Sequence, residues 1–247
     1  MMRNRSLGAM VVVTCCSLAT TAAAGQAPRT PDGHSDLTGI WQVMNTAAWD
    51  IQDHQARLGV PAGQGVVEGN DIPYTSAAAA KKKQNYENRS TADPETKCYL
   101  PGVPRITYMP FPFQIFQTPQ YVAIAYEWTH AYRIIHTNGS RHPEGIQFWM
   151  GDSRGHWEGE TLVVDVTNFN DETWFDRAGN FHSDALHVVE RYTRTGPDTI
   201  TYEATIEDPK VFTKPWKMSM FLYRHQEKNF RLLEYECYAV ADEESTK

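Results

Sequence analysis

The chain has 247 residues, of which 41% are hydrophobic and 21% are charged, and its formal net charge is −7. This composition is typical of a globular protein and excludes a collagen-like, coiled-coil or wholly disordered chain. An acidic surface disfavours the phosphate backbone of nucleic acid, so we expect no nucleic-acid partner. Beyond residue 24 no apolar run is long enough to span a bilayer, so we expect no membrane insertion.

The first 24 residues are typical of a cleaved secretory signal. Two arginines near the start precede a short apolar stretch, which ends in small residues up to Ala24. A lipoprotein signal ending at Cys15 or Cys16 is the alternative, but the residues before Cys15 make a poor lipobox. We therefore expect the mature chain, residues 25–247, to be in the periplasm or secreted. Formation of a homo-oligomer is left open.

Two cysteines, Cys98 and Cys237, remain after the predicted cleavage. Because an exported protein meets oxidising conditions, we expect a disulfide between them. Two free buried thiols are the alternative, and the absence of a C-x-x-C pair argues against a cysteine metal site.

β-Strand patterns begin at Asp36–Val43 and recur regularly after residue 112. The later segments are rich in Val, Ile, Thr and aromatic residues, and turn sequences separate them. They are Phe113–Thr118, Tyr121–Trp128, Ala131–Thr137, Gln147–Trp157, Thr161–Thr167, Ala185–Thr195, Thr199–Ile206, Trp216–Tyr223 and Phe230–Tyr238. Asn138-Gly139 is the strongest hairpin signal among the turns.

These patterns predict a mainly β fold with a single domain over residues 25–247. Short connections favour antiparallel neighbours, and about ten such strands tend to close because closure removes exposed edges. We expect an up-and-down, lipocalin-like barrel of about eight to ten strands, which would hold one small ligand inside. Residues 44–112 interrupt the pattern with a short helix over Ser76–Asn88. We expect this insertion to lie over the outside of the barrel or to cover one end.

Gly39-Ile40-Trp41 resembles the G-x-W motif of lipocalin-like (calycin) barrels, in which the tryptophan packs across the closed end. The long insertion departs from a plain lipocalin. The chain also resembles a family of exported bacterial proteins of unknown function, and this resemblance implies no particular reaction. It rests on three segments, CYLPGVPRITYMPFPFQIFQTP, WEGETLVVDVTNFNDETWFDRAGNFHSDALHVVERY and IEDPKVFTKPW.

The longest gap between strong strand signals after residue 113 is the loop 168–184, in which polar and aromatic residues are mixed. Long loops are often functional, and aromatic residues beside polar groups suit the mouth of a pocket. We predict His182 as an acid or base, Asp176 as its orienting carboxylate, and Asn170 and Trp174 as substrate-binding residues. The alternative is a turn-rich loop in which Asn and Asp bond their own backbone.

Glu190 is the only charge on an otherwise apolar face of its predicted strand. Such a carboxylate must be paired or have its pKa raised by desolvation. It is either a second proton-transfer group, with Arg133 stabilising an anion, or half of a structural ion pair with a residue such as Arg133. The remaining predicted substrate-binding residues are aromatic: Tyr126, Tyr132, Trp149 and Tyr192.

Several motifs that would define a chemistry are missing. The sequence has no glycine-rich phosphate loop or dinucleotide fingerprint, so we expect no organic cofactor. Nine histidines are present, but no H-E-x-x-H or H-x-x-x-H spacing occurs, and we expect no metal. The segment 151–155 fits the pattern of a hydrolase nucleophile elbow by chance, because a strand rather than a helix follows it.

These features favour an exported β-barrel enzyme with cofactor-independent acid–base chemistry of the lyase, dehydratase or isomerase type. Its substrate would be a small, largely apolar or aromatic molecule. The first alternative is a non-catalytic carrier of a small hydrophobic ligand, and the second is a metal-dependent hydrolase. In a carrier, Glu190 would be held in a tight ion pair and His182 would face solvent.

Overall fold

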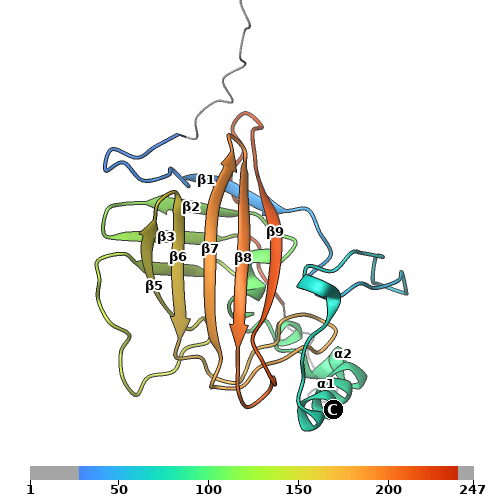
Figure 1. The fold of residues 1–247 in the computed structure, drawn as a ribbon. Coiled ribbons are helices and arrows are strands. Elements are labelled where there is room, and N and C mark those ends of the chain that lie inside the picture. Colours follow the sequence, from blue (N-terminus) through green and yellow to red (C-terminus); the bar gives the residue numbers. More distant parts are fainter. Residues whose placement is uncertain (1–27, 239–247) are drawn as a thin grey trace, which may run out of the picture.

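The computed structural model describes residues 28–238, so the secretory signal predicted over residues 1–24 lies outside the described residues. Within this range nine strands form one closed barrel in sequence order (Figure 1). The strands are β1 (Gly39–Val43), β2 (Phe113–Gln117), β3 (Tyr121–Tyr126), β4 (Tyr132–His136), β5 (Asp152–Glu158), β6 (Thr161–Thr167), β7 (His187–Gly196), β8 (Thr199–Glu207) and β9 (Trp216–Arg224). The predicted mainly β barrel is confirmed.

The predicted strand over Phe230–Tyr238 is wrong. Residues 225–238 contain no strand, and Tyr235 forms only an isolated bridge with Trp128. The reason is topological: β9 already pairs with β1, so the barrel offers no free edge to a further strand.

The predicted hairpin at Asn138-Gly139 is also wrong. Residues 137–151 instead form a long crossover, and β5 pairs with β4 in parallel through Ile135 with Ser153 and His136 with Arg154. This pair has a geometric cause. Nine strands that all alternated in direction would bring β1 and β9 together in parallel, whereas one parallel pair lets β9 meet β1 antiparallel. The closed sheet is therefore mixed.

Side chains fasten the crossover to the barrel. His142 bonds Asp152 at 2.7 Å and Asp165 at 2.8 Å, and the Asn168 amide donates to the Pro143 carbonyl at 2.7 Å. His187 of β7 bonds the second oxygen of Asp165 at 2.7 Å. The hydrogen bond to Asp165 is the main reason that the pKa of His187 is raised.

Trp41 lies fully buried in the core, and its indole N–H donates to the Leu37 carbonyl at 2.9 Å. The Arg194 guanidinium lies 5.6 Å from the centre of its ring. Gly39 has a φ of +140°, and a Cβ there would lie 2.9 Å from Nε of Arg224, so this position favours glycine. The barrel is thus consistent with the lipocalin-like architecture that the G-x-W resemblance implies.

The insertion contains short helices, of which α1 and α2 lie near one end of the barrel (Figure 1). They are η1 (Glu68–Asn70), α1 (Ser76–Glu87), α2 (Arg89–Ala92), η2 (Pro94–Lys97) and η3 (Arg105–Tyr108). The Thr75 hydroxyl caps α1 by accepting from the Ala78 N–H, so the predicted helix begins where expected. α1 ends one residue before the predicted end.

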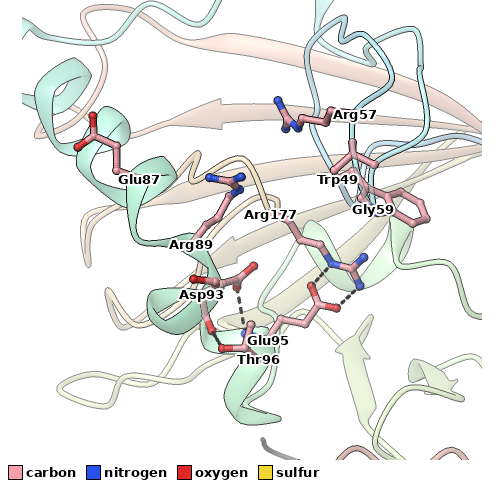
Figure 2. A pocket seen from close by; sticks show the side chains of 11 residues that line it. Trp49, Arg57, Gly59, Glu87, Arg89, Asp93, Glu95, Thr96 and Arg177 are labelled. Atoms are coloured by element: carbon pink, nitrogen blue, oxygen red, sulfur yellow. Dashed lines mark hydrogen bonds and ion pairs between the residues drawn. The ribbon is translucent and has the colours of Figure 1, made fainter.

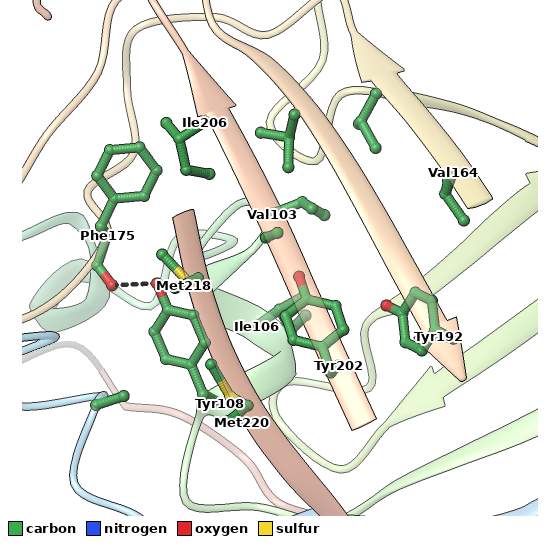
Figure 3. Close-up of a cluster of buried hydrophobic side chains, with 14 of the residues drawn as sticks. Val103, Ile106, Tyr108, Val164, Phe175, Tyr192, Tyr202, Ile206, Met218 and Met220 are labelled. Atoms are coloured by element: carbon green, nitrogen blue, oxygen red, sulfur yellow. Dashed lines mark hydrogen bonds between the residues drawn. The ribbon is translucent and has the colours of Figure 1, made fainter. Parts of the chain in front are cut away.

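Part of the insertion enters the core. Val103, Ile106 and Tyr108 are each at most 2% exposed and belong to the same buried cluster as β8 and β9. Figure 3 shows them beside Tyr202 and Met218, with the Tyr108 hydroxyl donating to the Phe175 carbonyl at 2.8 Å. The insertion therefore fills space inside the barrel as well as lying over it.

A disulfide joins Cys98 to Cys237 with a Cα–Cα distance of 5.5 Å, which confirms the predicted pair. It ties the segment after β9 to the insertion, just beyond η2. No helix among residues 28–238 has the length and apolar character needed to cross a bilayer.

Candidate functional site

Glu190 of β7 is the centre of a buried polar cluster inside the barrel, two of whose members, Arg133 and Ser153, also line a groove between β4 and β5. Its carboxylate is fully buried and receives both arms of the Arg133 guanidinium, one at 3.1 Å. The hydroxyls of Tyr192 and Tyr202 donate to its Oε1 at 3.0 and 2.9 Å. Arg133 also donates from Nε to the Ser153 hydroxyl at 2.9 Å. The structure therefore contains the Glu190–Arg133 ion pair that was one of the two sequence-based alternatives.

The pKa shifts of the tyrosines and of Arg133 keep each of these groups in one protonation state. Burial, followed by the Glu190 charge, raises the pKa of Tyr192 and of Tyr202, so both hydroxyls remain donors. Burial alone would lower the pKa of Arg133, but the Glu190 charge, the neighbouring tyrosines and the hydrogen bond to Glu190 together outweigh it, and the net direction is upward. Tyr126 is also buried here, and burial raises its pKa to about 12. Tyr126 and Tyr192 thus lie in the cluster around Glu190 rather than in an open pocket.

Asp176 organises the turn between β6 and β7. Its Oδ1 accepts from the N–H groups of Ala178 and Asn180 at 2.9 and 3.1 Å. Its Oδ2 accepts from the Ile51 N–H at 2.9 Å and from the Asn180 side-chain amide at 2.6 Å. Burial, and then the charge of Asp50, raises the pKa of Asp176 to about 7 against the effect of these hydrogen bonds. Asp176 therefore joins the loop to the insertion.

Replacing Asp176 with asparagine is expected to destabilise the protein by about 1–3 kcal/mol, the cost of an unmatched buried polar group. Both carboxylate oxygens accept two N–H groups, so the new amide nitrogen must face donors in either orientation. The measurement is the free energy of unfolding in urea. Asp71→Asn, on an exposed carboxylate, is the matched control and should change stability little. Equal stability of the two variants would contradict the structural role of Asp176.

His182 is 3% exposed and has a defined tautomer. Its Nδ1 lies 2.9 Å from the Ser183 carbonyl, which can only accept, so Nδ1 carries the proton. Nε2 then accepts from the Thr173 hydroxyl at 2.6 Å. Burial lowers the pKa of His182, so the imidazole is neutral near pH 7.

Three of the predicted catalytic residues, His182, Asp176 and Glu190, do not share hydrogen-bond partners. His182 bonds Thr173 and Ser183, Asp176 bonds backbone and Asn180, and Glu190 bonds Arg133 and two tyrosines. Asp176 does not orient the His182 ring, because both ring nitrogens bond other groups.

Two of the predicted residues of the 168–184 loop, His182 and Trp174, line a pocket of about 370 Å³. The pocket also includes charged residues from the insertion and the loop, namely Lys81, Lys97, Asp171 and Glu172. Asn170 has a different role, because its side-chain oxygen accepts from the Glu172 N–H at 3.2 Å in a local turn.

Two other predicted residues, Tyr132 and Trp149, lie on the outer side of the barrel. They line a groove of about 610 Å³, which we call the β4–β5 groove. Tyr132 and Ile134 are exposed on β4, whereas the alternate residues Arg133 and Ile135 are buried. The other apolar residues that line it are Leu100, Ala131, Phe148 and Met150, and its polar residues include His130, Gln147 and Asp152.

The insertion and the loop 168–184 share a buried charge network that the sequence predictions did not include. The Arg105 guanidinium donates to both oxygens of Asp93 at 2.8 Å and also to Glu95. Glu95 binds the guanidinium of Arg177 as well, with Nε at 2.9 Å (Figure 2). Burial would raise the pKa of Glu95, but Arg177 and Arg105 lower it overall. Arg105 stands alone among apolar residues in the sequence, the same signal that identified Glu190.

The fold is a closed, mixed nine-stranded barrel whose interior carries a paired polar cluster and whose outer side carries the grooves. Comparison of the chain with protein-family models, with curated proteins and with solved structures found no match. Within residues 28–238, no group of three or more His, Cys, Asp or Glu side chains has the arrangement of a metal site.

Proposed function

We propose that the protein binds a small, largely apolar, ring-containing molecule in the β4–β5 groove. The observation that carries this proposal is the gathering of large exposed apolar side chains in one concave site. Tyr132 is 75% exposed, and Ile134 and Phe148 line the same groove of about 610 Å³. Apolar side chains exposed together in a concavity of this size are typical of small-molecule sites.

The packing of the barrel supports a ligand outside it rather than inside. Val103 and Ile106 occupy the core beside β8, and Glu190 is bonded by Arg133 and two tyrosine hydroxyls. A ligand that entered the barrel would have to displace these groups. The observed ion pair of Glu190 also agrees with the expectation for a carrier, although the buried His182 does not.

The polar residues of the groove set the kind of ligand that it suits. His130 and Gln147 can donate or accept hydrogen bonds, and the Asp152 carboxylate, already bonded by Arg154 and His142, can only accept. Tyr132, Phe148 and Trp149 offer ring faces and edges. Trp149 is held in place by an edge-on contact with Tyr99, whose ring centre lies 5.1 Å away. A ligand with one aromatic or alicyclic ring system and few polar groups matches this lining.

Binding of N-phenyl-1-naphthylamine, a neutral aromatic probe whose fluorescence rises in apolar sites, tests the proposal. We expect saturable binding with one probe per chain, weakened about tenfold by Trp149→Ala, which corresponds to about 1.4 kcal/mol. Tyr121→Ala is the matched control, since Tyr121 is an exposed aromatic residue outside the groove. Absence of saturable binding, or equal loss in both variants, would overturn the proposal.

A catalytic function is the second candidate, and the specific observation in its favour is His182. A neutral imidazole that accepts a hydrogen bond from the Thr173 hydroxyl at 2.6 Å, at the wall of a pocket with Trp174, can act as a general base. This requires that small molecules reach His182. Carbethoxylation with diethyl pyrocarbonate, mapped by mass spectrometry, should then modify His182 as well as the exposed His130. Protection of His182 beside full modification of His130 would count against catalysis there.

Export to an oxidising compartment, the periplasm or the cell exterior, is part of the same proposal. The Cys98–Cys237 disulfide supports it, because such bonds persist where thiols are not kept reduced.

A further inference from the structure

A third concave site lies beside the insertion, and its lining shares no residue with the β4–β5 groove. It has a volume of about 540 Å³ and is bounded by residues 49–60, the turn between α1 and α2, η2 and Arg177 (Figure 2). Three arginines from three separate segments line it: Arg57, Arg89 and Arg177. We call it the arginine pocket.

Two of the carboxylates that line this pocket, Asp93 and Glu95, are paired with arginines. Asp93 receives two hydrogen bonds from Arg105, and Glu95 receives bonds from Arg105 and Arg177. Both carboxylates are at most 6% exposed. They are therefore matched by Arg105 and Arg177, and neither is a partner of Arg57 or Arg89.

Arg57 and Arg89 form no ion pair within residues 28–238. Their guanidinium carbons lie 5.1 and 4.2 Å from the centre of the Tyr86 ring, so the two like charges are held around one side chain. Glu87 also lines the pocket, but its ion pair is with Lys83 at 4.0 Å. Three arginines and three carboxylates line the pocket, and Arg105 behind Asp93 adds a fourth guanidinium, so the local charge is positive by one in a chain whose net charge is −7.

We propose that the arginine pocket binds a small organic anion, with Arg57 and Arg89 holding a carboxylate, phosphate or sulfate group. Guanidinium groups suit these oxyanions because their N–H donors match two oxygens at once. Trp49 lines the same pocket and offers an apolar wall for the carbon skeleton of the ligand. Arg177 is fixed by Glu95 and lies over the Trp49 ring, so its role is to position that wall.

Titration calorimetry of the purified protein at low salt, with benzoate, phenyl phosphate and phenyl sulfate as probes, tests this site. We expect at least one anion to bind with 1:1 stoichiometry and benzyl alcohol, the neutral counterpart of benzoate, not to bind. Binding of benzoate alone would assign a carboxylate ligand, and binding of the esters alone a phosphate or sulfate. Failure of all three anions to bind would overturn the proposal.

The double variant Arg57→Gln/Arg89→Gln should weaken anion binding at least tenfold and leave the melting temperature nearly unchanged. Arg141→Gln is the matched control, since Arg141 is exposed and lies outside the pocket. Equal weakening by Arg141→Gln would show a general charge effect and overturn the site. N-phenyl-1-naphthylamine binding should be the same in the double variant, because it reports the β4–β5 groove, so the two proposals fail independently.

Discussion

Replacing Glu190 with glutamine is expected to destabilise the protein by about 3–5 kcal/mol, the usual cost of breaking a buried ion pair from one side. The Arg133 guanidinium would remain buried without a counter-charge, and the new amide would meet hydroxyl donors from Tyr192 and Tyr202. The measurement is the free energy of unfolding from urea denaturation.

Glu203→Gln is the matched control for Glu190→Gln, because Glu203 lies on the adjacent β8 but forms no described ion pair. The double variant Glu190→Gln/Arg133→Met should recover part of the lost stability, since it removes the uncompensated charge. A loss below about 1 kcal/mol for Glu190→Gln would show that the barrel does not depend on this pair.

Removing the disulfide with Cys98→Ser/Cys237→Ser is expected to cost about 2–5 kcal/mol, because the bond closes a long loop in the unfolded chain. It should also release the segment after β9, which has no strand pairing within residues 225–238. Urea denaturation measures the first effect, and limited proteolysis followed by mass spectrometry measures the second.

The control for the cysteine variant is the wild-type protein treated with a reductant, which should show the same new cleavage within residues 225–238. Unchanged stability together with unchanged cleavage would mean that the segment is held by other contacts. Such contacts include the stacking of Tyr235 on Trp128 at 5.3 Å, the hydrogen bond from the Leu233 N–H to Glu127 at 2.7 Å and the His130–Glu236 pair at 3.0 Å.

Local patterns predicted most of the barrel, because strand periodicity and turn chemistry are encoded in neighbouring residues. The Asn138-Gly139 prediction failed because closure of nine strands requires one parallel pair, a property of the whole sheet. The Phe230–Tyr238 prediction failed for a related reason, since β9 pairs with β1 and the closed sheet leaves no free edge for another strand. Neither constraint is visible in a window of ten residues.

In the candidate site, too, the predictions based on a local pattern agree with the structure better than those that needed contacts between distant residues. The isolation of Glu190 on an apolar face predicted a buried carboxylate, and its pairing with Arg133 was one of the alternatives. The grouping of Asp176 with His182 rested on closeness in sequence, and in the structure Asp176 turns to Ile51 while His182 turns to Thr173. The arginine pocket could not be predicted, because its three arginines come from segments far apart in the chain.

The parallel pairing between β4 and β5 joins only two residues of each strand, and this affects where the barrel opens locally. Every other junction between neighbouring strands has more paired residues, so amide exchange through local opening should be fastest here. The β4–β5 groove lies over the same junction, with wall residues from both sides. A ligand bound between Tyr132 and Trp149 would link the two sides of this junction. Ligand binding is therefore expected to slow amide hydrogen exchange along both β4 and β5.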